Sequence, residues 1–465
     1  MNKKKLLHLG LHPDCVGEAI KCIQVASDAG EAEHPKRVIP LIIESPETFL
    51  ADSVWKPLAE SIIAAGKPHV FEPIGYLSWG QDLDENSLRQ MENACRLPVS
   101  RAAALMPDAH VGYGLPIGGV LACENAVVPY GVGVDIACRV KLTITDLPVM
   151  LLDENEPSVC RELDAALAKG TVFGTGGRHK NRQQHEVMDE DWTVTAVTRE
   201  MRDRAWDQLG TSGSGNHFVE WGIVELPDAS LGVELGRYVG LLSHSGSRGT
   251  GAQVCQRYTT IARQNAPSYI RNDPQLCHLA WLEMDTEAGQ EYWAAMNLMG
   301  RYAAANHAII HRNVVRLAGG TALATVENHH NFAWLERHGD RDLYVHRKGA
   351  TPAGVGDLGI IPGNMADTCF IVRGKGESRS LNSASHGAGR RMSRTAAKKQ
   401  YRWRDWTDHL KERKVRLLAG GIDEVPGVYK DIREVMAAQT DLVDPIGQFT
   451  PRIVMMCGDD SPAED

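Results

Sequence analysis

Apolar residues recur at helical spacing over one long stretch of the chain, Tyr292 to Leu317. The apolar positions are Met296, Met299, Tyr302, Ile309, Ile310, Val314 and Leu317. Steps of three and four residues place apolar side chains on one helix face, and Gly319 follows as a stop signal. The pattern therefore predicts a helix over 292–317. Shorter helices are predicted over Trp55–Ala65 and over residues 84–96.

Short apolar runs separated by glycine-rich turns begin after Met106 and are typical of a sheet. The predicted strands are Gly118–Ala122, Ala126–Pro129, Val132–Ile136 and Val140–Ile144, with a further strand-and-turn region over Leu343–Val372. Arg37–Glu44 also reads as a short strand, and a helix is expected after Gly389. Strands and helices alternate without a regular βαβ repeat. The predicted class is therefore α+β, or irregular α/β.

The 465 residues are enough for one large domain or two ordinary ones. Polar residues in apolar or glycine-rich surroundings appear only after about residue 80. We expect a catalytic domain over 80–465 and an N-terminal extension over 1–79, to which the sequence assigns no chemistry.

The composition, with 43% hydrophobic and 23% charged residues, is that of a soluble globular protein. No run reaches the roughly 18 apolar residues that a membrane helix needs, and the start has no apolar run typical of a signal peptide. Ten cysteines are scattered without a CxxC pair. We therefore expect a reduced, cytoplasmic protein without a membrane partner.

The net charge of −9 argues against a broad surface for nucleic acid. Between Arg373 and Arg404, however, ten basic residues accompany one acid, Glu377. Such a local patch can bind phosphate groups despite the overall charge. A solvated helix face explains the run equally well.

Two apolar segments carry potential metal ligands. VGVDIAC contains Asp135 and Cys138, and LLSHSGSRG contains His244. Carboxylate, thiolate and imidazole together suit a divalent transition metal. Taken alone, the first pair also fits a buried thiol beside a turn aspartate, and His244 fits a core histidine.

Two further segments add histidines. GTSGSGNHFVEW places Asn216, His217 and Glu220 after three glycines, which allow a tight turn and close approach of a ligand. An ordinary turn is the alternative. ENHHNF holds His329 and His330; adjacent side chains point in different directions, so only one of the two is expected to be a ligand.

In SASHGAGRRMSR, His386 is followed by Gly-Ala-Gly and the predicted helix. Backbone N–H groups at a glycine-rich helix start bind phosphate. A histidine beside them is a candidate nucleophile toward phosphorus. The five segments together indicate metal-assisted phosphoryl or nucleotidyl transfer.

The ordered motifs resemble the RtcB family of RNA ligases over roughly residues 80–455. They are MPDAHVGYG (106–114), VGVDIAC (132–138), GTSGSGNHFVEW (210–221), HSGSRG (244–249), HHNF (329–332), RKGAT (347–351), GIIPGNM (359–365), SHGAGRRMSR (385–394) and VYKDIREVMAAQTDLVD (428–444). The resemblance implies an RtcB-like fold, with mixed sheets around a buried dinuclear metal site.

The resemblance also implies roles for single residues. The matches to the ligands of two Mn²⁺ ions are Asp135, Cys138 with a bridging thiolate, His217, His244 and His330. The matches to nucleotide contacts are Asn216, Phe218, Glu220, Asn331, Pro362, Gly363, Asn364, Met365, Cys369, Gly387, Ala388 and Gly389. Among these, Asn216 and Asn331 match groups that hold the guanylate phosphate. His386 matches the histidine that becomes guanylylated, and His329 would lie behind the ligands.

The implied activity joins an RNA 3′-phosphate or 2′,3′-cyclic phosphate end to a 5′-hydroxyl end, with GTP and Mn²⁺ as cofactors. Broken RNA, such as tRNA or rRNA fragments, would be the substrate, the basic run would hold its backbone, and an accessory activating protein is a possible partner. The alternatives are a metal-dependent RNA phosphodiesterase or cyclic-phosphate hydrolase, and a non-catalytic RNA-binding protein.

Four positions depart from the family pattern. No lysine follows Lys430, where the family has a guanine-contacting lysine; Asn364 and Cys369 replace serines, and Arg139 replaces a common glycine. These changes leave the metal and histidine chemistry in place. They predict altered guanine selectivity and a divergent paralogue.

Overall fold

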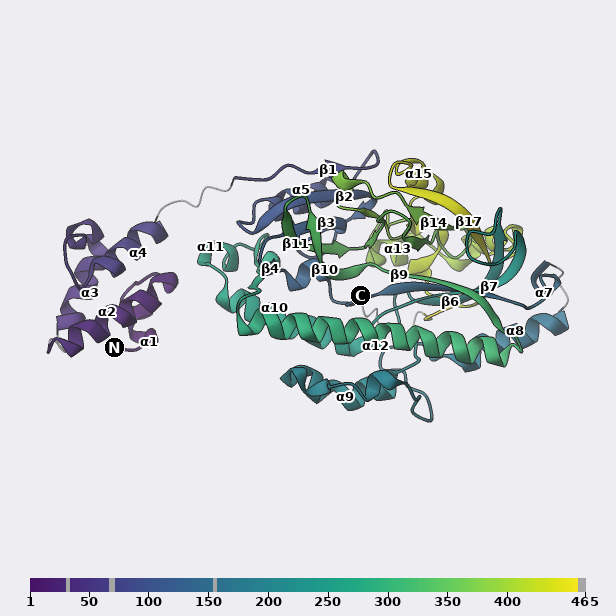
Figure 1. The fold of residues 1–465 in the computed structure, drawn as a ribbon, viewed down its shortest axis with the longest axis horizontal. Coiled ribbons are helices and arrows are strands. Elements are labelled where there is room, and N and C mark those ends of the chain that lie inside the picture. Colours follow the sequence, from purple (N-terminus) through teal and green to yellow (C-terminus); the bar gives the residue numbers. More distant parts are fainter. Residues whose placement is uncertain (31–33, 67–71, 154–156, 459–465) are drawn as a thin grey trace. The chain divides into compact units, whose positions relative to one another are not determined.

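A computed structural model describes residues 1–30, 34–66, 72–153 and 157–458. The chain divides into two compact units (Figure 1). Unit 1 contains Met1–Glu72 and Ala266–Pro274, and unit 2 contains Pro73–Asn265 and Gln275–Asp465. No helix within the described ranges is long and apolar enough to cross a membrane.

Unit 1 is helical. Its helices are α1 (Lys3–His8), α2 (Val16–Asp28), α3 (His34–Glu44), α4 (Lys56–Gly66) and α11 (Ser268–Arg271). They enclose a core that includes Leu6, Ile39, Trp55 and Leu58. The helix predicted over Trp55–Ala65 is confirmed as α4.

The strand predicted over Arg37–Glu44 is wrong, because this segment lies within α3. Val38, Ile39 and Ile42 are buried, whereas Leu41 is 53% exposed. This burial follows the period of a helix, not the alternation of a strand. Packing of one helix face against the unit 1 core overrides the strand preference of the β-branched residues.

Unit 2 is built on two large mixed sheets. One has the strand order β1 (Leu77–Ser78), β2 (Ser100–His110), β3 (Ile117–Cys123), β11 (Arg341–Lys348), β10 (Asn331–His338). The other has the order β13 (Leu358–Ile361), β14 (Cys369–Gly374), β17 (Val443–Met456), β6 (Phe218–Leu226), β7 (Gly236–Ser245), β5 (Arg139–Thr145), β9 (Ala322–His329), with β16 (Arg416–Ala419) beside β17. Two short pairs join β12 (Ala350–Pro352) to β15 (Ser383–Ser385) and β4 (Ala126–Val127) to β8 (Leu282–Glu283). The mixed α/β class expected from the sequence is confirmed.

The helices of unit 2 pack against these sheets and against one another. They are α5 (Glu85–Cys95), α6 (Pro129–Val132), α7 (Met150–Asp153), α8 (Pro157–Gly170), α9 (Ala196–Gln208), α10 (Arg248–Asn265), α12 (Glu287–Leu317), α13 (Arg394–Gln400), α14 (Thr407–Glu412) and α15 (Ile432–Ala437). The helix predicted over 292–317 is confirmed as α12, which lies alongside α10 (Figure 1). Ile310 and Val314 of α12 pack with Trp221 and Leu241 of the larger sheet. The helix predicted over 84–96 is confirmed as α5.

Three local predictions need correction. Val132–Ile136 is not a strand: α6 ends at Val132, and a turn follows that contains Gly133 at φ 106° and Ala137 at φ 56°. The strand predicted over Ala126–Pro129 ends at Val127. The helix expected after Gly389 begins at Arg394, where the Ser393 side chain accepts a hydrogen bond from the Ala396 N–H. Gly387–Gly389 therefore lie in a loop, not at a helix N-terminus.

The register of the larger sheet brings four strand ends together at one edge. The start of β5 pairs with the ends of β7 and β9, because Arg139 lies opposite both Ser245 and His329. Phe218, at the start of β6, lies opposite His244. Residues just before β5 and β6, near the end of β7 and just after β9 consequently converge.

Candidate active site and metal cluster

A cavity of about 1410 Å³ opens at this edge of unit 2. It is lined by nearly all of the site residues expected from the sequence: Asp135, Cys138, Asn216, Phe218, Glu220, His244, His330, Asn331, Pro362, Gly363, Asn364, Met365, Cys369, His386, Gly387, Ala388 and Gly389. His217 is buried directly behind the cavity wall, against Cys138 and Asp135. The structure thus brings together residues from six distant segments.

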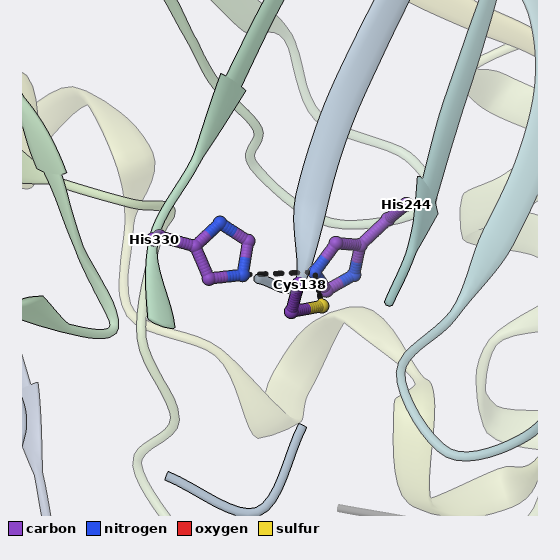
Figure 2. A group of neighbouring side chains, drawn as sticks. All are labelled: Cys138, His244 and His330. Carbon is purple, nitrogen blue, oxygen red and sulfur yellow. Dashed lines mark hydrogen bonds between the residues drawn. The ribbon is translucent and has the colours of Figure 1, made fainter. Parts of the chain in front are cut away.

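Cys138, His244 and His330 form the first group of potential ligands (Figure 2). Cys138 Sγ lies 3.1 Å from His244 Nε2, which lies 3.2 Å from His330 Nε2. All three side chains are buried. Each comes from a different strand end, so the sheet register itself sets the distances between them.

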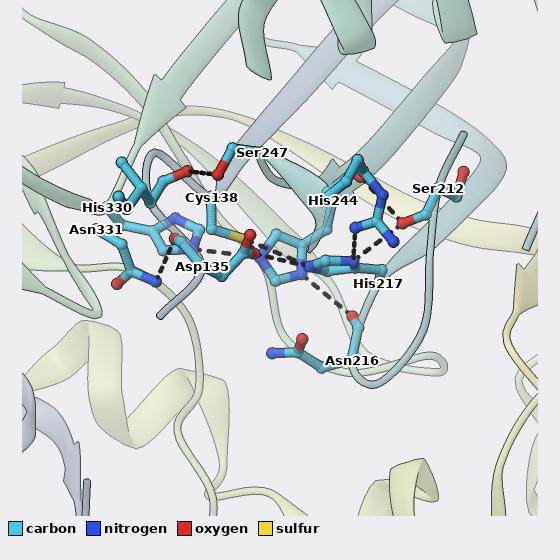
Figure 3. A network of polar contacts seen from close by, with 12 residues as sticks. Asp135, Cys138, Ser212, Asn216, His217, His244, Ser247, His330 and Asn331 are labelled. Carbon is cyan, nitrogen blue, oxygen red and sulfur yellow. Dashed lines mark hydrogen bonds and ion pairs between the residues drawn. The ribbon is translucent and has the colours of Figure 1, made fainter. Parts of the chain in front are cut away.

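Asp135, Cys138 and His217 form a second group, which shares Cys138 with the first (Figure 3). His217 Nε2 lies 3.1 Å from Asp135 Oδ2 and 3.5 Å from Cys138 Sγ. Although burial raises the pKa of Asp135, the hydrogen bond and charge of His217 outweigh it and hold the pKa below its usual value. Asp135 therefore adds a negative charge to the cluster.

Carbonyl groups orient two of the rings. His244 Nδ1 lies 3.1 Å from the Asn216 carbonyl, and His217 Nδ1 lies 2.9 Å from the Ser212 carbonyl. A carbonyl only accepts, so His244 Nδ1 carries the proton and His244 Nε2 directs a lone pair at the cluster. His217 Nδ1 also lies 3.2 Å from Nη1 of Arg248, which only donates. Burial lowers the pKa of His244 to about 3 and that of His330 well below its usual range, which keeps both rings neutral.

Converging lone pairs repel one another unless a cation lies between them. A thiol, a carboxylate and three imidazoles form the donor set that divalent transition metals prefer. The residues present therefore fit a metal centre, and the two groups around Cys138 allow more than one ion.

Close packing explains two glycines around this cluster. A side chain on Gly246 would overlap the Asp135 carboxylate, because its Cβ would lie 2.1 Å from Oδ1. A side chain on Gly213 would overlap the Arg248 guanidinium. These glycines leave room for the polar side chains beside them.

His386 lines the same cavity and lies directly after β15. Its ring centroid is 4.8 Å from that of His330. Its Nδ1 lies 2.6 Å from Oδ2 of the fully buried Asp108, on β2. The carboxylate fixes the proton on Nδ1, so Nε2 is the nitrogen with a free lone pair.

The phosphate-binding backbone groups expected after His386 need correction, because two of them bind Asp108 instead. The backbone N–H groups of His386 and Gly387 donate to Asp108 Oδ2, at 3.2 and 3.4 Å. These two donors hold the aspartate and are not directed at a ligand. The sequence analysis did not assign Asp108 a role, although it lies within the MPDAHVGYG motif, because its partner is 278 residues away.

The adjacent histidines point in different directions, as expected. His330 belongs to the cluster, whereas His329 packs against Phe332 and Trp334.

The side-chain amide of Asn331 connects the surrounding loops: it donates to the Asp135 carbonyl and accepts from the Gly349 N–H. The Asn364 side chain is similarly engaged within its own turn, with Ala366 and Asp367.

Lys348 is a second residue that the sequence analysis left without a role. It is buried in the cavity wall, and burial lowers its pKa to about 8. Its Nζ donates to the carbonyls of Tyr113 and Tyr130, at 2.5 and 3.1 Å. Lys348 thus joins the wall near His386 to two tyrosines.

The basic run between Arg373 and Arg404 is partly neutralised by folding. Arg390 and Arg394 pair with Glu424, and Lys398 with Asp423. Lys375 pairs with Asp444. Arg390, Arg391 and Arg394 line the cavity. The cationic surface therefore lies at the cavity, but its charge is smaller than the sequence count suggests.

Glu220 lies deep in the cavity wall, and burial raises its pKa well above its usual value. Burial also raises the pKa of the neighbouring Cys369 thiol, and the charge of Glu220 adds to the shift. Burial in this setting favours the neutral form of the carboxyl, which can donate a hydrogen bond.

The Glu220→Gln variant is expected to be more stable than the unchanged protein at pH 8 when no nucleotide is bound. Because the pKa in the folded state is raised above that in the unfolded state, Glu220 destabilises the fold increasingly as pH rises from about 4.5. Glutamine does not titrate. We expect Tm to rise by about 1 °C at pH 8, which corresponds to roughly 1 kcal/mol for a unit of this size, and the difference to shrink toward pH 5. Calorimetry at both pH values measures it, and a difference independent of pH would contradict the burial of a titrating carboxyl.

The chain is similar over most of its length to a set of known proteins. The family model described as tRNA-splicing ligase RtcB matches residues 90–203 and 177–457. An RNA-splicing ligase RtcB of Escherichia coli (strain K12) is 32% identical over 397 residues, which cover 80% of this chain and 95% of that protein. A tRNA-splicing ligase RtcB of Thermococcus kodakarensis is 32% identical, with 76% and 86% covered. An RNA-splicing ligase RtcB of Mycobacterium bovis is 32% identical, with 78% and 98% covered. With matches that span all the cavity-lining motifs from strand β2 onward, the chain belongs to the RtcB family.

Proposed function

We propose that this chain is an RNA ligase that uses GTP and Mn²⁺ to join RNA 3′-phosphate or 2′,3′-cyclic phosphate ends to 5′-hydroxyl ends. One observation carries the proposal. His386 Nδ1 is bound to Asp108, which leaves Nε2 as the nitrogen available for attack, and the ring lies beside the Cys138, His244 and His330 cluster in a cavity large enough for a nucleotide. The curated relatives are RNA-splicing ligases by name, which supports the same activity.

Asp135, Cys138, His217, His244 and His330 are the residues that would hold two Mn²⁺ ions, with the Cys138 thiolate shared between them. Bound metal would offset phosphate charge next to the nucleophile. Asn216, Phe218 and Glu220 follow one another along the cavity wall at the start of β6 and are proposed to hold the nucleotide.

The reaction begins at His386. Its Nε2 attacks the α-phosphorus of GTP, an N–P bond forms, and the bond to pyrophosphate breaks. An oxygen of the RNA 3′-phosphate then attacks the guanylyl phosphorus and releases His386, which leaves GMP on the RNA end. The 5′-hydroxyl of the second RNA end finally attacks the 3′-phosphate, and GMP departs. A cyclic end is first opened to a 3′-phosphate. Asp108 stabilises the positive charge that develops on the ring when His386 bonds to phosphorus.

A joining assay tests the proposal. Two labelled RNAs, one with a 3′-phosphate and one with a 5′-hydroxyl, are incubated with the protein, Mn²⁺ and GTP. We expect a joined product that requires GTP. A cyclic-phosphate end that is opened without GTP and never joined would identify a hydrolase. Protein that retains metal but changes no RNA end would identify a binding protein.

Asp108→Asn is expected to slow guanylylation by up to about 10⁴-fold, the loss seen when an aspartate that orients a catalytic histidine is replaced by asparagine. The variant keeps the shape of the side chain but loses the charge that fixes the proton on Nδ1. Single-turnover labelling with GTP measures the rate. GTP binding measured in parallel should change little, because Asp108 is buried behind His386. An unchanged labelling rate would contradict a positioning role.

A further inference from the structure

We propose that Tyr113, Tyr130 and His278 form a platform on which an unpaired RNA base stacks at the mouth of the cavity. This inference rests on the proposed function, since it names how the RNA strand that reaches His386 is held. It assigns a role to three aromatic side chains that the chemistry at the cluster does not use.

The three rings form a triangle. The centroids of Tyr113 and Tyr130 are 6.4 Å apart, and those of Tyr130 and His278 are 5.2 Å apart. The centroids of Tyr113 and His278, which are 5.9 Å apart, complete the triangle. Tyr113 is 66% exposed and also lines the cavity, so it is the ring that links the triangle to the catalytic space.

The turn that carries Tyr113 is held rigidly. Gln90 bonds the backbone of Gly112 in both directions, with its amide donating at 2.5 Å and its carbonyl oxygen accepting at 3.0 Å. Lys348 binds the Tyr113 carbonyl. Gly114 packs so closely on the His278 carbonyl that a Cβ would lie only 2.8 Å from its oxygen. A large apolar ring is therefore held in solvent on a fixed backbone, which reduces the entropy lost when a base stacks on it.

Charge around the platform suits a nucleic acid strand. Arg263 lies over the Tyr130 ring at 5.8 Å and donates to His278 Nδ1 at 2.5 Å. Burial, together with the charges of Arg263 and Lys348, lowers the pKa of His278, so the ring stays neutral. Neutral π-faces with a cation behind them favour a base over a positively charged ligand.

The platform lies close to the reacting groups along the cavity wall. Lys348, which binds the carbonyls of Tyr113 and Tyr130, is followed by Gly349, and a Cβ on Gly349 would lie 3.2 Å from the His386 ring. A strand whose end reaches His386 can thus place a base near its end over Tyr113. Stacking does not depend on base identity, which fits an enzyme that joins ends of different sequence.

A fluorescent RNA tests the platform. A short single-stranded RNA with a 3′-phosphate and 2-aminopurine near that end is titrated with the protein in Mn²⁺ without GTP. We expect quenching on binding by the unchanged protein. Tyr113→Ala should lose the quenching and bind about tenfold more weakly, within the range that one lost base–aromatic stack produces. Tyr113→Phe should retain both, because it keeps the ring.

Leu235→Ala is the matched control, since Leu235 is 71% exposed and lies away from the cavity lining; it should behave as the unchanged protein. RNA with an abasic site near the 3′ end should bind the unchanged protein about tenfold more weakly than intact RNA does. Tyr113→Ala should bind the abasic and the intact RNA equally well. Quenching and affinity that survive in Tyr113→Ala, or tight binding of the abasic RNA, would overturn the platform. If RNA ends are joined equally well with and without the base near the 3′ end, the platform is overturned but the proposed ligase is not. If RNA binding depends on that base but no joined product forms, the platform is supported and the proposed ligase is overturned.

Discussion

The His386→Ala variant is expected to take up no label when it is incubated with Mn²⁺ and GTP labelled at the α-phosphate. The unchanged protein should retain label after denaturation and lose it in acid, as a phosphorus–nitrogen bond does. The physical reason is the geometry of one ring. Asp108 holds the proton on Nδ1, and Nε2 faces the cavity beside the ligand cluster. Labelling should fall by at least 10³-fold, the usual scale for loss of a nucleophile.

His8→Ala serves as the control because His8 is an exposed histidine in unit 1. It should be labelled like the unchanged protein. Label that persists in His386→Ala would show that another group is the nucleophile and would remove the basis of the proposed function. No label in the unchanged protein, with metal bound, would favour the hydrolase.

Parallel reactions with ATP examine the departures from the family pattern. Asn364 is engaged within its own turn, and Cys369 lies beside Glu220. The tail in which the family carries a lysine lies, from residue 459 onward, outside the described residues. A neutral Glu220 can still donate to a base. Labelling by ATP as fast as by GTP would show that guanine selectivity has been lost.

The sequence predicted elements well where the signal was local. The period of α12 and the position of α5 follow directly from the spacing of their apolar residues. The prediction failed where packing between distant segments determines the secondary structure. An example is α3, whose β-branched residues are buried along one helix face. The turn at Asp135 shows the same limit: its apolar neighbours resemble a strand, but Gly133 and Ala137 have positive φ angles.

The candidate site was accessible from the sequence only as residue types. Cys138, His244 and His330 could be named, but their convergence depends on the register of β5, β7 and β9, which is a property of the whole sheet. Asp108 could not be paired with His386 because nothing local links β2 to the loop after β15. For the same reason, the acid that neutralises Arg390 and Arg394 could not be foreseen: Glu424 lies 34 and 30 residues away from them in the chain.

The Cys138→Ala variant is expected to lose Mn²⁺ binding, and with it all joining of RNA. Cys138 is the one side chain common to both groups of ligand atoms, 3.1 Å from His244 Nε2 and 3.5 Å from His217 Nε2. Its removal takes a negatively charged donor from each proposed ion at once. Metal analysis of the purified protein measures occupancy directly, without reliance on activity.

Thermal unfolding gives a second measure of the same loss. A metal that binds only the folded state stabilises it by about 2.7 kcal/mol when its free concentration is 100 times Kd. Tm of the unchanged protein should therefore rise with Mn²⁺ and fall on chelation, whereas Tm of Cys138→Ala should not respond. Cys95→Ala is the matched control: Cys95 is also buried, but it lies on α5, and its metal response should be intact. Full occupancy in Cys138→Ala would contradict a bridging thiolate, whereas an unchanged protein that takes up no metal would show that the cluster is a core of histidines instead of a metal centre.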